Sequence, residues 1–595
     1  MKTFEPSYRQ SVVDLERALG DPDLAGNDIS FASGWHADET ETLPVHGLHL
    51  LDRLALRRRL VPRSLGGELA TAEELLWLIR SVARRDMNVA VSVSTQIWSF
   101  VVWIGGNDEQ RRDFAHDMLA GEVIPCLAYS EEQHGADFAA NDCVATEGVD
   151  GTFLISGRKW PINRGSTSTH ALVLARTAAV DNFQNQSLFL LDKRTVPADR
   201  VNGLPRTPTV GLRGCDISGI AFDRAPVPPA ALIGTRGRGM ETALRGLMLT
   251  RTLCSALSLG VGDTLLRKTY EHLVGRRLYA RRAVDLPHVR EALCHAYLNL
   301  LAAECVALVA MRGLHLFESE FSAWSSVVKV QVSRLVDSAG DELSALLGAR
   351  HFFRDLAHAG IFQKMRRDGA VVSMFDGSSS VCLDSLAMQL PALERGTRRT
   401  RDEDWRQLYD LGQPLDPWEP GDVAVFGRGR DAVTASLTHL LDSLSSVRPD
   451  DENDARRVRA LRTAGESLRG ELDDVLAAIV AERPPRPTDG PAGIKDTPAR
   501  LMRLAQRYSE VHTKVACLGI WLYNRHRLGV FFRRGAWLEA FLNRADTARG
   551  VLGDLAPETA RDLFEHLDRQ FHDRAYFSVI SMPQAAAGSH GDLDS

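Results

Sequence analysis

The sequence offers little that is typical of a metal-binding, secreted or nucleic-acid-binding protein. Its eight cysteines are scattered, with no CxxC and no cysteine–histidine spacing suited to a metal, so we expect reduced, mostly buried thiols and no metal site. The segment MKTFEPSYRQ at the start lacks the apolar core of a secretion signal. A formal net charge of −6 gives no electrostatic case for nucleic acid. These absences predict a cytoplasmic protein that does not bind nucleic acid.

Long apolar segments that could span a membrane are also few. One uncharged stretch, residues 88–107, approaches the length of a membrane span, but Asn88, Ser92 and Gln96 dilute it. It predicts a buried helix of a soluble protein and no transmembrane segment. Basic residues gather at Arg57–Arg59 and within residues 276–282, where they could meet a phosphate or an acidic partner, or form a solvated helix face.

At 595 residues the chain exceeds what one hydrophobic core usually organises, and 44% hydrophobic residues supply material for several. The apolar periodicity predicts a multidomain α+β protein that is mainly α. We expect four parts: an N-terminal helical domain (1–122), a central β-barrel or β-sandwich domain (123–235), a helical bundle (236–395) and an additional α-helical domain (396–595).

The last 200 residues show helical periodicity without a recognisable motif. Residues 484–493, PPRPTDGPAG, predict a loop, and the segment after about Ser581 predicts a disordered tail. Three sets of apolar residues are each expected on one helical face: Val433, Leu437, Leu440, Leu441 and Leu444; Val458, Leu461, Leu468, Leu472, Val475, Leu476 and Ile479; and Leu501, Leu504, Tyr508, Val511, Val515, Leu518 and Leu522.

Four segments resemble, in order, motifs of the acyl-CoA dehydrogenase superfamily. They are AYSEEQHGADF (128–138), GRKWPINRG (157–165), VGLRGCDISGIAFDRAPVP (210–228) and RRDGAVVSMFDGSS (366–379). The resemblance covers roughly residues 40–392, about two thirds of the chain. It implies the family's fold of helices, β domain and helical bundle. It also implies bound FAD and, because the family's flavin site lies between subunits, a homodimer or homotetramer.

The resemblance also implies a set of cofactor-binding residues. Trp160 would form an aromatic wall beside the isoalloxazine, and Arg276 would match an arginine of the family. The full set carried over from the motifs is Tyr129, Ser130, Gly135, Ala136, Trp160, Ile162, Arg276, Ser378 and Ser380.

Asp376 matches the family's catalytic base, which removes the proton α to a thioester carbonyl while the β hydrogen leaves as hydride to flavin N5. Arg251, Phe375 and Gly377 would contact the substrate. An aspartate in a glutamate position falls short by about 1.5 Å, so the resemblance implies a closer substrate, a different carbon acid or an impaired dehydrogenase. Alternatively, Asp376 only caps a turn.

Several positions depart from the family pattern. Ile162 replaces a hydroxyl residue that hydrogen-bonds flavin, Ala136 replaces a serine near the pyrophosphate, and Arg350 and His351 replace glycines of a turn that receives the neighbouring subunit's FAD. These changes imply weaker cofactor contacts. The C-terminal part resembles, in placement only, the extension of very-long-chain acyl-CoA dehydrogenases.

The leading hypothesis is an FAD-dependent dehydrogenase or oxidase of an acyl thioester in specialised metabolism, with CoA or a carrier protein as the carrier. A second hypothesis keeps the fold and changes the chemistry, because nitroalkane oxidases of this superfamily use aspartate as the base and N-hydroxylating flavin monooxygenases share the fold. A third is a non-catalytic assembly protein that has lost its cofactor. The acyl group and the electron acceptor are not determined by the sequence.

Overall fold

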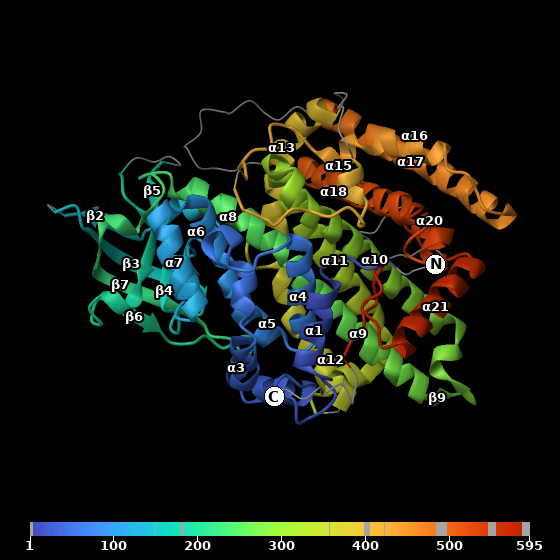
Figure 1. Cartoon of the computed structure of the whole chain (residues 1–595), viewed down its shortest axis with the longest axis horizontal. Helices are drawn as coiled ribbons and strands as arrows, with labels where there is room; N and C mark the ends of the chain where they lie inside the picture. The colour runs from blue at the N-terminus through green and yellow to red at the C-terminus, as the bar shows by residue number, and fades with distance from the viewer. Residues whose placement is uncertain are drawn as a thin grey trace.

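The computed structural model describes residues 4–148, 150–179, 184–355, 357–397, 405–421, 423–482, 497–544 and 555–585. It is mainly helical with one sheet domain, which confirms the predicted fold class (Figure 1). The predicted loop at 484–493 lies outside the described residues.

The N-terminal region consists of helices that cover one side of the molecule. Thr71 caps α4 by accepting a hydrogen bond from the Glu74 N–H at 3.1 Å, and every residue of that helix is buried. The uncharged stretch around residue 95 forms two short helices joined by a 3-10 turn rather than one long helix. The bounds are α1 (Arg9–Leu19), α2 (Phe31–Glu39), α3 (Val45–Arg53), α4 (Ala72–Ala83), α5 (Met87–Ser94), η3 (Thr95–Trp98), α6 (Ser99–Gly105) and α7 (Asp108–Ala120).

The central domain is a mostly antiparallel sheet with the strand order β6-β7-β3-β2-β4-β5-β8, and β1 pairs in parallel with β4. The longest pairing joins β3 to β7, and its register is irregular between Lys159 and Ile162, inside the second motif. The strands are β1 (Pro125–Ala128), β2 (Val144–Glu147), β3 (Phe153–Asn163), β4 (His170–Arg176), β5 (Gln186–Asp192), β6 (Val201–Leu204), β7 (Ile217–Val227) and β8 (Leu232–Ile233).

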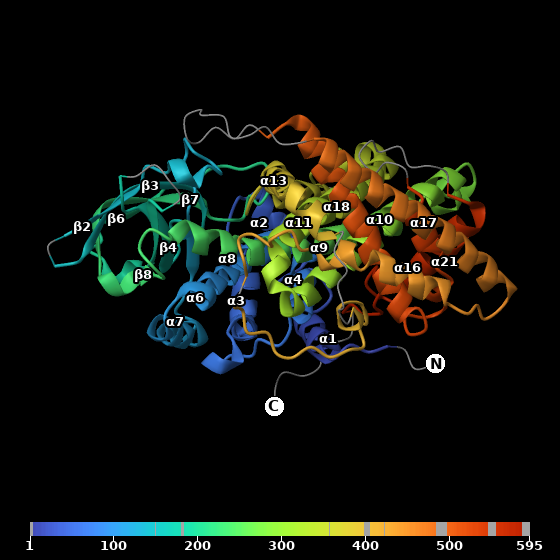
Figure 2. The ribbon, with the colours of Figure 1, turned by 90° about the horizontal axis from the view of Figure 1, so that it is seen from above.

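A bundle of long helices follows the sheet and forms the centre of the molecule (Figures 1 and 2). Its main helices are almost entirely buried along their central turns. They are α8 (Gly239–Leu253), α9 (Ser255–Gly275), α10 (Pro287–Leu316), α11 (Phe321–Leu347), α12 (Ala357–Gly369) and α13 (Ser379–Thr397).

The additional helices lie on the far side of the bundle from the sheet in both views (Figures 1 and 2). Helix α18 packs on the bundle, where Ser509 accepts a hydrogen bond from Gln331 and Glu510 pairs with Arg334 at 2.8 Å. The apolar faces predicted from the sequence are buried, except for a half-buried Leu522. The principal helices are α15 (Ala432–Ala435), α16 (Leu437–Ser445), α17 (Glu452–Ala481), α18 (Ala499–Asn524), α20 (Ala536–Leu542) and α21 (Pro557–His572).

Residues 575–585 return to the N-terminal helices. Glu304 of α10 accepts hydrogen bonds from the Ser578 hydroxyl (2.5 Å) and the Val579 N–H (2.8 Å), and Met582 is fully buried. The prediction of a disordered tail from about Ser581 is therefore wrong for residues 581–585, because their apolar and polar groups are satisfied by tertiary contacts. Residues 586–595 lie outside the described residues.

Two stretches of the described residues are long and apolar enough to cross a membrane, Met87–Gly105 and Pro287–Leu316. Their most apolar windows are 83% and 94% buried within the protein, as expected of core helices. All eight cysteines are free and buried, as predicted.

Candidate active site

The predicted base lies in a tight turn between the short 3-10 helix η10 (Ala370–Ser373) and α13. Asp376 and Gly377 both have positive φ angles, 52° and 89°, which Asp and Gly tolerate better than most residues. The Ser378 hydroxyl accepts a hydrogen bond from the Val381 N–H at 3.3 Å and so caps α13. The cap and the turn together fix the direction of the half-buried Asp376 side chain.

The end of α8 packs against this turn. The Cys254 thiol donates a hydrogen bond to Asp376 Oδ2 at 3.7 Å, and burial raises the pKa of Cys254, so the thiol stays protonated and remains a donor. Arg251, which is 6% exposed, lies directly over Gly377, because a Cβ added there would be 2.9 Å from Arg251 Nη2. A side chain at position 377 would therefore displace the guanidinium. On the other side, the Lys329 ammonium lies 4.4 Å from the ring centroid of Phe375.

The first motif reaches the same place from the β domain. The Tyr129 carbonyl accepts hydrogen bonds from Lys159 Nζ (3.1 Å) and Asn141 Nδ2 (2.9 Å), which fix the backbone. The Tyr129 hydroxyl is buried and has no hydrogen-bond partner within the described ranges. Burial, followed by the charge of Asp376, raises its pKa well above the usual value. The turn of Asp376 and the first motif thus form the two sides of one junction.

Glu131 in the first motif has a structural role. Its buried carboxylate pairs with Lys159 at 2.8 Å and accepts the N–H groups of Asp142 (2.6 Å) and Cys143 (3.0 Å). These bonds close the loop between Tyr129 and β2. Its middle, with Gly135 and Ala136, is exposed, and no atom lies within 4 Å of a Cβ added to Gly135. Gly135 and Ala136, which match cofactor-binding positions of the family, are therefore accessible at the surface.

In the second motif, Trp160 and Asn163 are half-buried, whereas Ile162 is fully buried. The half-buried Trp160 donates from Nε1 to Thr207 Oγ1 at 3.0 Å. Ile162 is 2% exposed and belongs to the hydrophobic core, so its predicted contact with flavin has no support from the packing. Asn163 donates to the Val91 carbonyl at 3.3 Å, while its Oδ1 is buried without a partner in the described structure. The motif match placed Asn163 in the turn after Trp160 and not among the cofactor-binding residues, whereas the structure has it as the last residue of β3.

Other motif residues hold the domains together. Asp216 accepts bonds from the Ser166 hydroxyl (2.9 Å) and the Thr167 N–H (3.0 Å), which fastens the turn after β3. Arg213 pairs with Asp38 of α2 at 2.6 Å, and the Leu212 N–H donates to Asp368 of α12 at 2.6 Å. These family-like positions therefore join the β domain to the helices.

Arg276 lies far from the junction within one chain. Cys254 precedes the first turn of the 21-residue helix α9, and Arg276 follows its last turn, so the helix rise separates them by roughly 30 Å. The Arg276 side chain is half-buried and has no hydrogen bond or ion pair among the residues described. Nearby Tyr279 is 89% exposed, and Ser380 of α13 is also exposed. The structure does not bring Arg276 together with Asp376 within one chain, whereas Ser380 lies four residues after Asp376 with an exposed side chain.

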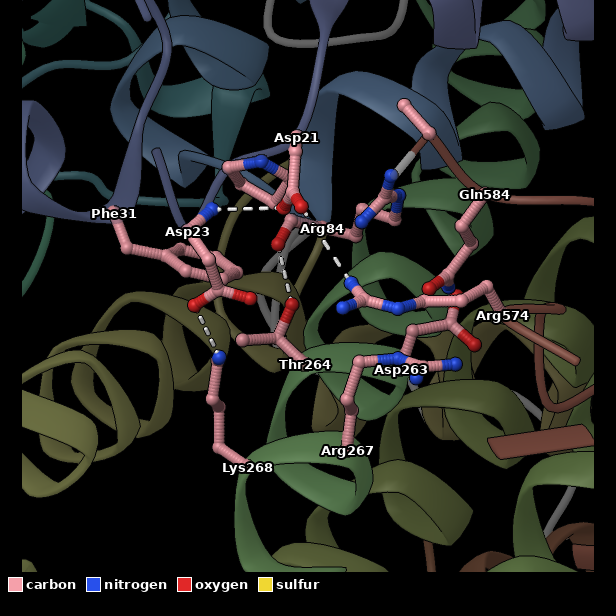
Figure 3. Close-up of a pocket in the computed structure, with 12 residues that line it drawn as sticks. Asp21, Asp23, Phe31, Arg84, Asp263, Thr264, Arg267, Lys268, Arg574 and Gln584 are labelled. Atoms are coloured by element: carbon pink, nitrogen blue, oxygen red, sulfur yellow. Dashed lines mark hydrogen bonds and ion pairs between the residues drawn. The ribbon is translucent and has the colours of Figure 1, made fainter. Parts of the chain in front are cut away.

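Two other polar features are separate from the junction. Arg58 and Arg59 pair with Glu68 at 2.6 and 3.4 Å, so the first basic cluster is largely neutralised. Figure 3 shows a polar pocket between α9 and the returning C-terminal segment, in which Lys268 pairs with Asp23 and with Glu271 (2.8 Å). The pocket contains no residue of the motifs.

The junction fits a flavin by the chemistry of its hydrogen-bonding groups. Tyr129 Oη and Arg251 Nε are buried donors and Asn163 Oδ1 is a buried acceptor, and none of the three has a hydrogen-bond partner in the described ranges. All three lie on or beside the motif segments. Together with the half-buried Trp160, these groups are of the kind that bind a polar aromatic cofactor, as in the class of flavoprotein oxidoreductases.

Comparison with known proteins agrees with this class. The model of the acyl-CoA dehydrogenase middle domain matches residues 126–225, and that of the C-terminal domain matches residues 237–390. An acyl-CoA dehydrogenase of Bacillus subtilis (strain 168) is 23% identical over 346 residues, which is 58% of this chain and 89% of the relative. The chain belongs, through these domains, to the acyl-CoA dehydrogenase superfamily of FAD-dependent oxidoreductases.

Solved structures show the same fold. An acyl-CoA dehydrogenase from Bacillus anthracis, solved with FAD, superposes with a TM-score of 0.66 at 15% identity and covers 96% of this chain and 97% of its own. That coverage includes the additional C-terminal helices. The prolyl acyl carrier protein oxidase AnaB superposes with a TM-score of 0.55 at 15% identity, over 63% of this chain and 95% of its own.

Proposed function

We propose that this protein catalyses FAD-dependent α,β-dehydrogenation or oxidation of an acyl thioester, with Asp376 as the base. The observation that carries the proposal is the environment of Asp376. The carboxylate is held in a constrained turn beside the Cys254 thiol, and the neighbouring Tyr129 Oη and Arg251 Nε are buried without hydrogen-bond partners in the described structure. Buried polar groups without partners beside a carboxylate support a ligand site at this turn.

In this proposal Asp376 removes the α proton, and Cys254 orients it through the hydrogen bond to Oδ2. Arg251, Phe375 and Gly377 surround the thioester end of the substrate. Bound FAD would supply the acceptor for the β hydride. The shorter aspartate requires the substrate to approach the turn more closely than it would approach a glutamate.

The chain's own residues would hold the cofactor mainly through backbone and ring contacts. Trp160 would face the flavin ring, and Ser130 and Asn163 would meet its polar edge. Arg276 and Phe352 suit a second copy of the chain, because Arg276 has no side-chain hydrogen bond or ion pair among the described residues and Phe352 is 79% exposed beside His351. A homodimer would bring Arg276 to the neighbouring cofactor.

The carrier is CoA or a carrier protein. The structural neighbour AnaB is an oxidase of a prolyl acyl carrier protein, and the departures from the common motifs at Ala136, Arg350 and His351 favour a role in specialised metabolism. A second candidate function, oxidation of a nitroalkane or a related carbon acid, is favoured by the identity of the base, because Asp376 takes the place of a glutamate.

The test is a visible absorption spectrum of the purified protein, followed by anaerobic titration with acyl-CoA and acyl-carrier-protein thioesters. We expect a yellow protein that is bleached by a thioester, with an enoyl product in the mass spectrum. Bleaching by a nitroalkane alone would transfer the assignment to the second candidate. A colourless protein that cannot be reconstituted with FAD would overturn both functions.

A further inference from the structure

Lys329 is an unusual residue in the middle of an apolar helix. It lies in the run VVKVQV of α11 and is 2% exposed. Its ammonium group is buried and has no hydrogen-bond partner in the part of the chain that the structure describes. Other buried lysines are paired: Lys159 with Glu131 at 2.8 Å, and Lys364 with Asp368 at 2.9 Å. Burying a cation without an ion-pair partner lowers the stability of the fold, so a functional role is the usual explanation for such a residue.

Arg251 has the same property from the opposite side of the turn. It is 6% exposed, its Nε is buried without a partner, and its guanidinium forms no hydrogen bond or ion pair with any described residue. Its Nη2 lies against Gly377, whereas Lys329 lies against the ring of Phe375. The two cations therefore contact the residues immediately before and after Asp376.

The charges of Lys329 and Arg251 both affect the Cys254 thiol. Cys254 Sγ lies 3.7 Å from Asp376 Oδ2. Burial raises the pKa of that thiol, while the charges of Lys329 and Arg251 oppose the effect. Lys329 of α11, Arg251 of α8 and Asp376 of the turn therefore all lie near Cys254.

We propose that Lys329 and Arg251 form a cationic pair that stabilises the negative charge developing on the thioester oxygen when the α proton leaves. This inference rests on the proposed function. The α C–H bond breaks, the proton passes to the Asp376 carboxylate, and the electron pair moves onto the thioester oxygen as an enolate. Charge is conserved, and no oxidant is needed for this half of the reaction. Preorganised charges in a dry site are effective for such a step.

A purely structural role for Lys329 would be to hold Phe375 by the cation–π contact, which is typically worth about 0.5–2 kcal/mol. The two roles differ in what they change. A structural contact affects folding and substrate affinity, whereas an enolate-stabilising charge changes the acidity of a bound carbon acid. The distinguishing measurement is therefore the pKa of a bound ligand.

Acetoacetyl-CoA is a suitable probe, because its α carbon is acidic, its enolate absorbs in the ultraviolet, and it has no β hydrogen to lose. Binding to the wild-type holoenzyme should lower the pKa of the probe. Lys329→Met should reduce this ionisation roughly tenfold or more, and Lys329→Arg should restore part of it. Lys514→Met is the matched control, since Lys514 is 5% exposed but pairs with Glu471 at 2.8 Å in the additional domain.

The outcomes are distinct. Ionisation that is unchanged in Lys329→Met, with a normal melting temperature, would overturn the role of the cationic pair and leave the proposed function standing. A wild-type enzyme that binds the probe without ionising it would do the same. No binding to the wild-type holoenzyme would overturn CoA-thioester recognition and this inference together. If Lys329→Met does not fold, Lys329→Gln gives the same comparison with a polar side chain of smaller volume.

Discussion

Two regions of the molecule bury charged groups in opposite ways. Between α4, α9 and α10, Arg80 pairs with Asp263 at 2.7 and 2.9 Å and with Glu304 at 3.1 Å, and each of the three side chains is at most 1% exposed. At the turn of Asp376, Arg251 and Lys329 are nearly as buried but have no such partners among the described residues. In the first region the chain itself supplies the partners of each charge, whereas at the turn the described residues do not.

The satisfied region also explains how the C-terminal segment is retained. Glu16 of α1 pairs with Arg84 and with Arg85 (2.7 Å), and it accepts bonds from Tyr576 and the Ala585 N–H. The charges of the two arginines overcome the effect of burial and hold the pKa of Glu16 far below its usual range. Charge pairing therefore stabilises the contact between the C-terminal segment and the N-terminal helices.

The largest expected effect concerns the turn. Asp376→Asn should slow flavin reduction by a thioester roughly 10²–10⁴-fold, because the amide cannot accept the α proton. The protein should keep its melting temperature and its FAD. The measurement is anaerobic stopped-flow reduction, with Asp199→Asn, an exposed carboxylate (75%), as the control. Turnover that survives intact in Asp376→Asn would remove this residue from the role of base.

The comparison between paired and unpaired cations can be tested by stability. Arg80→Met should lower the free energy of unfolding by about 3–5 kcal/mol, because it leaves Asp263 and Glu304 buried without their partner. Lys329→Met should cost little or increase stability, because it removes a buried charge that has no ion pair among the described residues. Denaturant unfolding at pH 7 measures both.

Arg456→Ala, which breaks an exposed ion pair with Glu558, is the control and should leave the free energy of unfolding nearly unchanged, because solvent screens such pairs. Equal losses in Arg80→Met and Lys329→Met would show that Lys329 is stabilised within the protein and is not poised for a ligand.

A smaller effect should follow pH. His566 of α21 stacks on Phe531 at 4.2 Å, and neither of its ring nitrogens has a partner in the described part of the chain. Burial, and then the charge of Arg569, lowers the pKa of His566 to about 3. The folded state therefore favours the neutral ring. Its contribution to stability is complete above the ordinary pKa of about 6.5 and is lost as pH falls from there towards 3.

Urea unfolding at pH 7, 6 and 5 should show this difference. Below about pH 6.5 the wild type should lose up to about 1.4 kcal/mol per pH unit more than His566→Phe, which keeps the ring and removes the titrating group. Burial also lowers the pKa of His315, to about 4. Because both proteins contain His315, its effect cancels in the difference between them. Parallel pH profiles for wild type and variant would show that His566 is solvated when protonated.

Much of the fold could be predicted from the sequence. The helix–sheet–helix order, the buried cysteines and the apolar faces of α16, α17 and α18 were visible as periodicity and composition, because local spacing decides which face of an element is apolar. The C-terminal segment could not be predicted. Residues 582–585 have no helical or strand periodicity, and the Ala585 N–H is held by Glu16, more than 560 positions away.

The site was only partly predictable. The motifs located Asp376, Tyr129 and Trp160, whose roles stay predictions. The motifs did not distinguish Ile162 in the core from Asn163 with its free oxygen, because a register irregularity in β3 decides which side chain turns inward. Lys329 was overlooked, although a single lysine within VVKVQV was a visible signal.

By itself, the sequence determined the order of the domains, the family and the identity of the acid in the turn, since these depend on composition and on short motifs. Only the tertiary structure decided which buried charges have partners. That distinction arises because Arg80, Arg251 and Lys329 look alike as isolated letters, whereas the cost of burying each one depends on groups brought close from distant parts of the chain.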